Sequence, residues 1–361
     1  MSEHIQHPVY KNINQKEGET EGWAFLNAKD FKKINFSMPP LGETEVRGKI
    51  LYSGLCHSDV LTGRALWGDV LYPLSTGHEG VAEVIEVGSK VDKLKKGDIF
   101  LIGCFRNSCG KCNQCSDTYD NLCTSLEPAQ RFTYGLYYGT YSSHIQLEQY
   151  WAIKAPEGLD LPNAAPLMCA GITTYAPIAR YGKKGRKCAV LGVGGLGHMA
   201  VQYASKLGME VTAFVSDLKK EEFVKSLGAT HVVNWVKDDL EALKGSFQLL
   251  VNTLPVMPNP KQLEALVSTL EPNGDFVQLG VPNQAEVFAV APSAFVTYNI
   301  SIHGSLVGSR KETEEMLDFS LKHGVKVLCE HFKFDEFDKA LDKLENGKPI
   351  FRCVVDFCHN K

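Results

Sequence analysis

Residues 56–59 place a thiol, an imidazole, a hydroxyl and a carboxylate in four consecutive positions, as Cys56, His57, Ser58 and Asp59. They close the apolar run at residues 49–55, which predicts a strand that ends at this group. Later in the chain, His78 and Cys169 add a second imidazole and a second thiol. Two thiolates and one imidazole leave zinc with one open coordination position, so these residues predict a catalytic zinc site.

Each proposed ligand also has an alternative role. A free cysteine packs as a small apolar side chain, and a lone histidine is more often a hydrogen-bonded polar residue than a ligand. The presence of Cys56, His78 and Cys169 in one chain favours zinc over these alternatives. Asp59 is then expected to hydrogen-bond the second ring nitrogen of His78 and fix its orientation. Glu79, which follows His78, is expected to approach the metal when the ligand shell rearranges.

A second group of thiols falls within one short stretch and consists of Cys109, Cys112, Cys115 and Cys123. Two-residue spacers let successive sulfurs face a common point, and four thiolates complete a tetrahedral zinc shell. Such a site has no open position, so we interpret it as structural. Independent free thiols are the alternative. Cys104 breaks the spacing, and we interpret it as belonging to neither site.

The glycine-rich turn at residues 192–197 fits the pattern G-x-G-x-x-G, between a predicted strand at residues 188–191 and a predicted helix at residues 198–207. The first glycine permits the turn, the second lets a pyrophosphate approach the backbone, and the third lets helix pack on strand. The unpaired N–H groups of the helix N-terminus attract phosphates. This context favours dinucleotide binding over a flexible turn, and the residues assigned to it are Gly192, Gly194, Gly195, Leu196 and Gly197.

The residues after the next predicted strand, at residues 211–215, should select the cofactor. Ser216, Lys219 and Lys220 suit the 2′-phosphate of NADP, whereas Asp217 suits the ribose hydroxyl of NAD. We favour NADP(H) over NAD(H). The alternative is that the lysines only solvate the start of a helix.

Length and composition limit the class of protein. A chain of 361 residues exceeds what one core usually supports, so two domains are expected. A net charge of -4 gives no reason to expect nucleic acid or an anionic membrane as a partner. Residues 1–20 are polar, without a signal-peptide core, and no apolar run could span a bilayer, which predicts a flexible N-terminal extension and a cytoplasmic protein. The 11 cysteines are clustered, which favours metal binding over disulfides.

Local patterns predict an α/β protein with two kinds of domain. Short β-rich runs between residues 22 and 151, such as 81–88 and 99–102, predict an irregular β domain. From residue 161, strands alternate with helices, which predicts a doubly wound parallel sheet. The later elements are expected at residues 231–233, 249–252 and 276–279 (strands), 311–323 and 334–345 (helices) and 352–357 (a last strand).

Together these motifs resemble those of the zinc-dependent medium-chain alcohol dehydrogenases, specifically the cinnamyl alcohol dehydrogenase-like branch. The resemblance covers nearly all of the chain after residue 22. Besides the motifs above, it includes the stretches at residues 161–175 and 304–309, Glu312 with Thr313, and Arg352.

The resemblance implies a GroES-like catalytic domain (residues 21–160 and 305–361) beside a Rossmann domain (residues 161–304). It implies a catalytic zinc in the cleft on Cys56, His78 and Cys169. It also implies a homodimer joined through the sheet edge at residues 295–302.

The implied reaction is hydride transfer between NADP(H) and a primary alcohol or aldehyde, aromatic or medium aliphatic. Ser58 would pass the proton to or from the substrate oxygen, which the zinc polarises. The cofactor contacts implied by family position are His57, Thr173 and Arg352. Trp67 and Leu306 are candidate pocket walls, with an ordinary core role as the alternative for each.

The chain departs from the family pattern at two places. The proton relay of the family ends in a histidine where this chain has Leu61, and Gly80 and Ala82 change the small residues beside Glu79. Leu61 and the polar N-terminal extension motivate one alternative, a catalytically weak member that serves as a structural or binding component. Another is a polyol or secondary-alcohol dehydrogenase that uses the same zinc.

Overall fold

The computed structural model describes residues 20–134, 138–282, 286–347 and 349–358, and the chain divides into two compact units. The first unit comprises Met1–Cys169, Ser309–Leu321 and Lys326–Lys361, and the second comprises Ala170–Gly308 and Lys322–Val325. Most of the expected N-terminal extension, residues 1–19, lies outside the described residues, and Thr20 already begins a strand.

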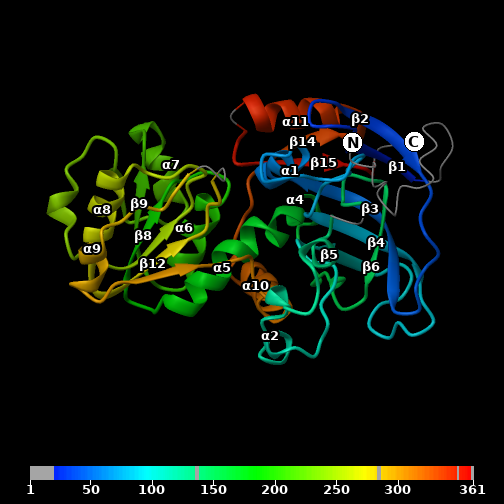
Figure 1. Cartoon of the computed structure of the whole chain (residues 1–361), viewed down its shortest axis with the longest axis horizontal. Coiled ribbons are helices and arrows are strands. Elements are labelled where there is room, and N and C mark those ends of the chain that lie inside the picture. The colour runs from blue at the N-terminus through cyan, green and yellow to red at the C-terminus, as the bar shows by residue number, and fades with distance from the viewer. Residues whose placement is uncertain (1–19, 135–137, 283–285, 348, 359–361) are drawn as a thin grey trace. The chain divides into compact units, whose positions relative to one another are not determined.

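The first unit is built on a seven-stranded sheet with the order β14-β15-β3-β4-β5-β7, in which β6 also pairs with β3 (Figure 1). All pairings are antiparallel except β14 with β15. The strands are β3 (Glu45–Leu55), β4 (Gly80–Val87), β5 (Ile99–Ile102), β6 (His144–Glu148), β7 (Ile153–Lys154), β14 (Cys329–Lys333) and β15 (Arg352–Asp356). A separate hairpin joins β1 (Thr20–Phe25) to β2 (Phe31–Phe36). This architecture agrees with the predicted β-rich domain.

The helices of this unit lie mostly in the connections between strands, and all but α10 and α11 are short; the last two residues of α10 belong to the second unit. They are α1 (His57–Gly63), α2 (Asn113–Ser116), η2 (Asp120–Leu122), α3 (Pro128–Arg131), α4 (Leu161–Ala164), η3 (Ala165–Met168), α10 (Arg310–His323), η6 (Phe334–Glu336) and α11 (Phe337–Asn346). The helix expected at residues 334–345 therefore begins as a 3₁₀ turn. None of the described helices combines the length and hydrophobicity that crossing a bilayer requires.

The second unit is a six-stranded parallel sheet with the order β10-β9-β8-β11-β12-β13 (Figure 1). This is the doubly wound strand order of dinucleotide-binding domains. Its strands are β8 (Lys187–Leu191), β9 (Glu210–Val215), β10 (His231–Asn234), β11 (Phe247–Asn252), β12 (Leu270–Gln278) and β13 (Ser301–Gly304). Its helices are α5 (Ala170–Tyr181), α6 (Gly197–Lys206), η4 (Leu218–Lys220), α7 (Glu221–Ser226), η5 (Leu240–Leu243), α8 (Pro260–Ser268) and α9 (Pro292–Val296).

Two predicted boundaries differ from the structure. The first unit continues to Cys169 instead of ending at residue 160, because α4 and η3 pack against strands of its sheet. The segment at residues 295–302 is not one edge strand: Phe295 lies in α9, and only residues 301–302 lie in β13, which is one of the two edge strands of the parallel sheet.

Candidate active site and metal centres

Three turns of the first unit bring the predicted catalytic zinc ligands together. Cys56 stands between the end of β3 and the start of α1, and His78 with Glu79 immediately precede β4. Cys169 follows η3. One ligand atom from each of these four side chains lies within 4.8 Å of all the others, and all four residues are buried. The sulfur and nitrogen donors are those that zinc prefers, so the group fits the metal.

The sulfur atoms of this group are close enough to share one ion. Cys56 Sγ lies 3.9 Å from Cys169 Sγ, and His78 Nε2 lies 3.2 Å from Cys169 Sγ. A hydrogen bond from Cys169 is the main reason why the pKa of Cys56 lies well below its ordinary value, and the positive charge of Arg352 adds to the effect. A lowered pKa favours the thiolate, which is the form that binds metal.

Asp59 holds His78 in place, as predicted. Its Oδ1 accepts hydrogen bonds from His78 Nδ1 at 2.9 Å and from the backbone N–H of Gly77 at 2.8 Å. Its Oδ2 accepts from the backbone N–H of Cys56 at 3.0 Å and from the hydroxyl of Tyr141 at 2.8 Å. Asp59 is fully buried, and these four bonds stabilise its charge. The imidazole thereby presents Nε2 to the sulfur ligands.

Glu79 and Arg352 form a buried ion pair, which local sequence patterns did not indicate. Arg352 Nη2 contacts Glu79 Oε1, and the residues are 5% and 0% exposed, respectively. Burial raises the pKa of the Glu79 carboxyl, and the guanidinium of Arg352 opposes that shift. Within the described residues, Glu79 Oε2 has no hydrogen-bond partner, and a Cβ atom on Gly54 would lie 2.1 Å from it. The contact of Arg352 with a cofactor phosphate stays a prediction.

The remaining residues proposed for catalysis lie close to this group in the chain. Ser58 is half-buried in α1, and its Oγ lies 3.6 Å from Cys56 Sγ. His57 is exposed at the start of α1, and Leu61 is half-buried in the same helix. Cys104 is not a member of either group of potential ligands, but its side chain hydrogen-bonds with Cys169, which lowers the pKa of Cys104 to about 6.

The four cysteines of the second group also converge. Their sulfur atoms lie within 4.8 Å of one another, and none of the four is in a disulfide. Backbone N–H groups of Cys109 and Cys112 donate to Cys123 Sγ at 3.4 Å and to Cys109 Sγ at 3.3 Å. A backbone hydrogen bond from Cys115 is the main reason why the pKa of Cys112 falls to about 5. The group therefore fits a closed, structural zinc site.

The glycine-rich turn of the second unit has the geometry that its pattern predicts. Gly192 follows β8 with a φ of +85°, which other residues rarely adopt. A Cβ atom on Gly197 would lie 1.8 Å from the carbonyl oxygen of Gly192, so only glycine allows α6 to approach β8 this closely. A Cβ atom on Gly194 would meet nothing within 4 Å, so that position is open for a ligand.

The other proposed cofactor residues of this unit lie at two places. Ser216, Lys219 and Lys220 are exposed after β9. Asp217 caps η4 by accepting a hydrogen bond from the backbone N–H of Lys219 at 3.1 Å. Thr173 is buried in α5, 8% exposed. Of the two proposed pocket walls, Trp67 is half-buried and Leu306 is 42% exposed.

Two alanine substitutions separate the roles of these glycines. Gly194→Ala should leave the free energy of unfolding within about 0.5 kcal/mol of the native value but weaken dinucleotide binding roughly tenfold or more, because the methyl group occupies the phosphate position. Gly197→Ala should instead destabilise the second unit by about 3 kcal/mol, because the clash is with backbone. Nucleotide titration and urea unfolding measure the two effects. Equal loss of stability in both variants would contradict the assignment.

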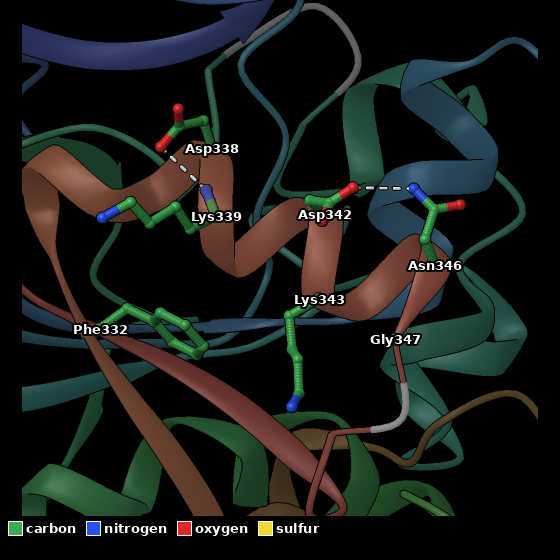
Figure 2. Close-up of a pocket in the computed structure, with 7 residues that line it drawn as sticks. All are labelled: Phe332, Asp338, Lys339, Asp342, Lys343, Asn346 and Gly347. Carbon is green, nitrogen blue, oxygen red and sulfur yellow. Dashed lines mark hydrogen bonds between the residues drawn. The ribbon is translucent and has the colours of Figure 1, made fainter.

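A surface groove of the first unit lies elsewhere. It has a volume of about 490 Å³ and runs along α11 beside the end of β14 (Figure 2). Its lining residues are Phe332, Asp338, Lys339, Asp342, Lys343, Asn346 and Gly347. Its two carboxylates and two ammonium groups balance, and it contains none of the residues of either cysteine group. We therefore assign no chemistry to it.

Known proteins share both units. Residues 42–157 match the family model of the alcohol dehydrogenase GroES-like domain, and residues 195–322 match that of the zinc-binding dehydrogenases. A probable mannitol dehydrogenase of Fragaria ananassa is 36% identical over 94% of this chain and 95% of its own length. Probable cinnamyl alcohol dehydrogenase 6 of Arabidopsis thaliana is 34% identical over 94% of each protein.

Solved structures agree with these matches. A cinnamyl alcohol dehydrogenase of Sorghum bicolor superimposes with a TM-score of 0.88 at 32% identity, covering 95% of this chain and 99% of its own. A cinnamyl alcohol dehydrogenase of Helicobacter pylori, solved in complex with NADP(H), superimposes with a TM-score of 0.85 at 34% identity, covering 93% of this chain and 97% of its own. The expected pair of domains, GroES-like and Rossmann, is confirmed.

Proposed function

The chain belongs to the zinc-containing medium-chain alcohol dehydrogenase family, and on that premise we propose that it transfers a hydride between NADP(H) and a primary alcohol or aldehyde. The substrate we propose is aromatic or medium aliphatic. The observation that carries the proposal is the convergence of Cys56, His78, Glu79 and Cys169 within 4.8 Å. A zinc ion held by the two thiolates and the imidazole would supply Lewis-acid polarisation of the substrate oxygen.

The residues of this chain would prepare and complete that chemistry. Asp59 fixes the ring of His78, and the depressed pKa of Cys56 supplies a thiolate. We propose that the hydroxyl of Ser58 passes the proton to or from the substrate oxygen. We further propose that His57, Thr173 and Arg352 contact the cofactor.

NADP(H) is the cofactor we propose. The exposed Ser216, Lys219 and Lys220 offer a hydroxyl and two positive charges to a 2′-phosphate, whereas Asp217 is engaged in capping η4. Side-by-side assays with NADPH and NADH test this choice, with an aromatic and a short aliphatic aldehyde. We expect a higher kcat/KM with NADPH, and we expect Lys219→Ala combined with Lys220→Ala to reduce that preference. Equal or better use of NADH by the native protein would contradict it.

The proposal also covers metal content and assembly. We propose two zinc ions per chain, with the second in the Cys109, Cys112, Cys115 and Cys123 group, and a cytoplasmic homodimer that pairs through β13. Metal analysis of the native protein and its mass in solution test these points. Fewer than two zinc ions per chain would contradict the assignment of one of the two groups.

The proton route makes a sharper prediction. Because Leu61 cannot carry a proton, Leu61→His should raise turnover by about a hundredfold if the shortened relay limits the rate. Leu61→Asn is the matched control, since it adds a polar group of similar size that does not exchange a proton in this pH range. Steady-state kcat measures both. No change with histidine would show that the proton leaves by another route.

Leu61 also supports a second candidate function, that of a weakly catalytic structural or binding component. This second function predicts two zinc ions per chain, nucleotide binding and no turnover with a wide panel of aldehydes, polyols and secondary alcohols. Turnover with mannitol or another polyol would instead favour the polyol reaction, which the names of three relatives suggest.

A further inference from the structure

Tyr141 is the one side chain outside the turns of the candidate active site that donates to Asp59 among the described residues. Its hydroxyl lies 2.8 Å from Asp59 Oδ2, and both residues are fully buried. The tyrosine is 82 residues away from Asp59 in the chain. It belongs to none of the motifs that predicted the zinc site.

The backbone of Tyr141 is fixed on both sides. Its N–H donates to the carbonyl oxygen of Thr76 at 3.1 Å, and its own carbonyl oxygen accepts from Trp23 at 2.8 Å. Thr76 lies two residues before His78, so the backbone of Tyr141 is bonded to the segment that carries the proposed ligand. The main chain of Tyr141 is therefore held beside the segment that carries His78.

An aromatic cluster holds the ring of Tyr141. Phe337 of α11 packs edge-on at 4.6 Å between ring centroids, and Phe31 of β2 packs edge-on at 6.3 Å. Such edge contacts restrict the ring to one orientation. The N-terminal hairpin and the C-terminal helix of the first unit thus direct one phenol at the carboxylate behind His78.

We propose that Tyr141 is a positioning residue for the zinc site, acting through Asp59. Without its hydroxyl, Asp59 Oδ2 keeps only the bond from the backbone N–H of Cys56, and the carboxylate is less restrained against rotation. Rotation would weaken the bond from Oδ1 to His78 Nδ1 and turn Nε2 away from the sulfur ligands. This inference rests on the proposed function, because it needs His78 to bind the metal.

The test measures how fast a chelator removes zinc, apart from any enzyme assay. Tyr141→Phe removes only the hydroxyl and keeps the ring packing. Tyr138→Phe is the matched control, because Tyr138 is 1% exposed, packs on Phe36 at 4.8 Å and does not donate to Asp59. Cys169→Ser should retain only the zinc of the four-cysteine group, so zinc release from this variant identifies the rate that belongs to that group.

We expect active-site zinc to leave about tenfold faster from Tyr141→Phe and at the native rate from Tyr138→Phe. The release from the four-cysteine group should be unchanged in both. In an Asp59→Asn background, Tyr141→Phe should have no further effect on release, which distinguishes action through Asp59 from a general loss of stability. If Asp59→Asn does not fold, the comparison of Tyr141→Phe with Tyr138→Phe still shows whether the Tyr141 hydroxyl slows the release of active-site zinc.

Three outcomes would overturn the inference. If Tyr141→Phe releases active-site zinc at the native rate and only its melting temperature falls, the hydroxyl stabilises the fold and does not position the zinc site. An undiminished effect of Tyr141→Phe in the Asp59→Asn protein would show that it does not act through Asp59. A native protein without zinc in the Cys56, His78 and Cys169 group would overturn the proposed function and this inference with it.

Discussion

Replacing Cys169 with serine is expected to lower turnover by about a thousandfold or more while leaving NADPH affinity unchanged. A serine hydroxyl is not deprotonated at neutral pH, so it replaces a thiolate ligand poorly. Cys169 Sγ lies 3.2 Å from His78 Nε2 and 3.9 Å from Cys56 Sγ, so the substitution removes one of the three proposed zinc ligands from the centre of the group. Losing a metal that lowers the barrier by several kcal/mol accounts for a rate effect of this size.

Cys112→Ser is the matched control for this prediction. It should also remove one of two zinc ions, but from the four-cysteine group, so metal content would fall equally while turnover at 25 °C is largely kept. NADPH affinity should stay native in both, because neither cysteine is among the residues proposed to contact the cofactor. Metal analysis, nucleotide titration and steady-state kinetics separate the cases. Retained activity in Cys169→Ser would remove Cys169 from the proposed role.

The features that local sequence predicted best are those that short segments form alone. The helix expected at residues 198–207 runs from Gly197 to Lys206, since Gly208 ends it and the glycine-rich turn begins it. The spacing of the four cysteines likewise predicted a group whose sulfurs meet within one loop. In both cases the interacting residues are close together in the chain, so their spacing in the sequence is enough to predict how they lie in the structure.

The features that local patterns missed depend on distant segments. Glu79 and Arg352 are 273 residues apart, and Tyr141 reaches Asp59 from 82 residues away. Nothing in the composition of either segment indicates the other. The segment at residues 161–169 has a helical sequence pattern like that of the second unit. It nevertheless packs on the sheet of the first unit, because tertiary contacts outweigh local propensity. Long-range packing therefore decides both the domain boundary and the surroundings of the proposed zinc.

Replacing Arg352 with methionine should have the largest effect on stability among these substitutions, about 3–5 kcal/mol of unfolding free energy. Methionine fills much of the same space, but Glu79 then keeps a buried carboxyl with no positive partner at Oε1 and none at Oε2 within the described residues. Either the charge stays unsolvated or the carboxyl takes up a proton at a free-energy cost. Glu79→Gln should also destabilise, because it leaves the buried guanidinium of Arg352 without its carboxylate partner.

The double variant decides whether the ion pair itself is the cause. Arg352→Met with Glu79→Gln leaves no charge on either side chain, so it should be more stable than Arg352→Met alone and recover much of the lost free energy. Urea unfolding of the native protein, the two single variants and the double variant, with zinc in excess, measures the coupling between the two side chains. Lys33→Met is the control. The ion pairs of Lys33 with Glu21 and Asp335 are exposed at the surface and should contribute under about 1 kcal/mol to the free energy of unfolding. Additive losses in the double variant would contradict the pairing, because two uncoupled side chains have no shared charge to remove.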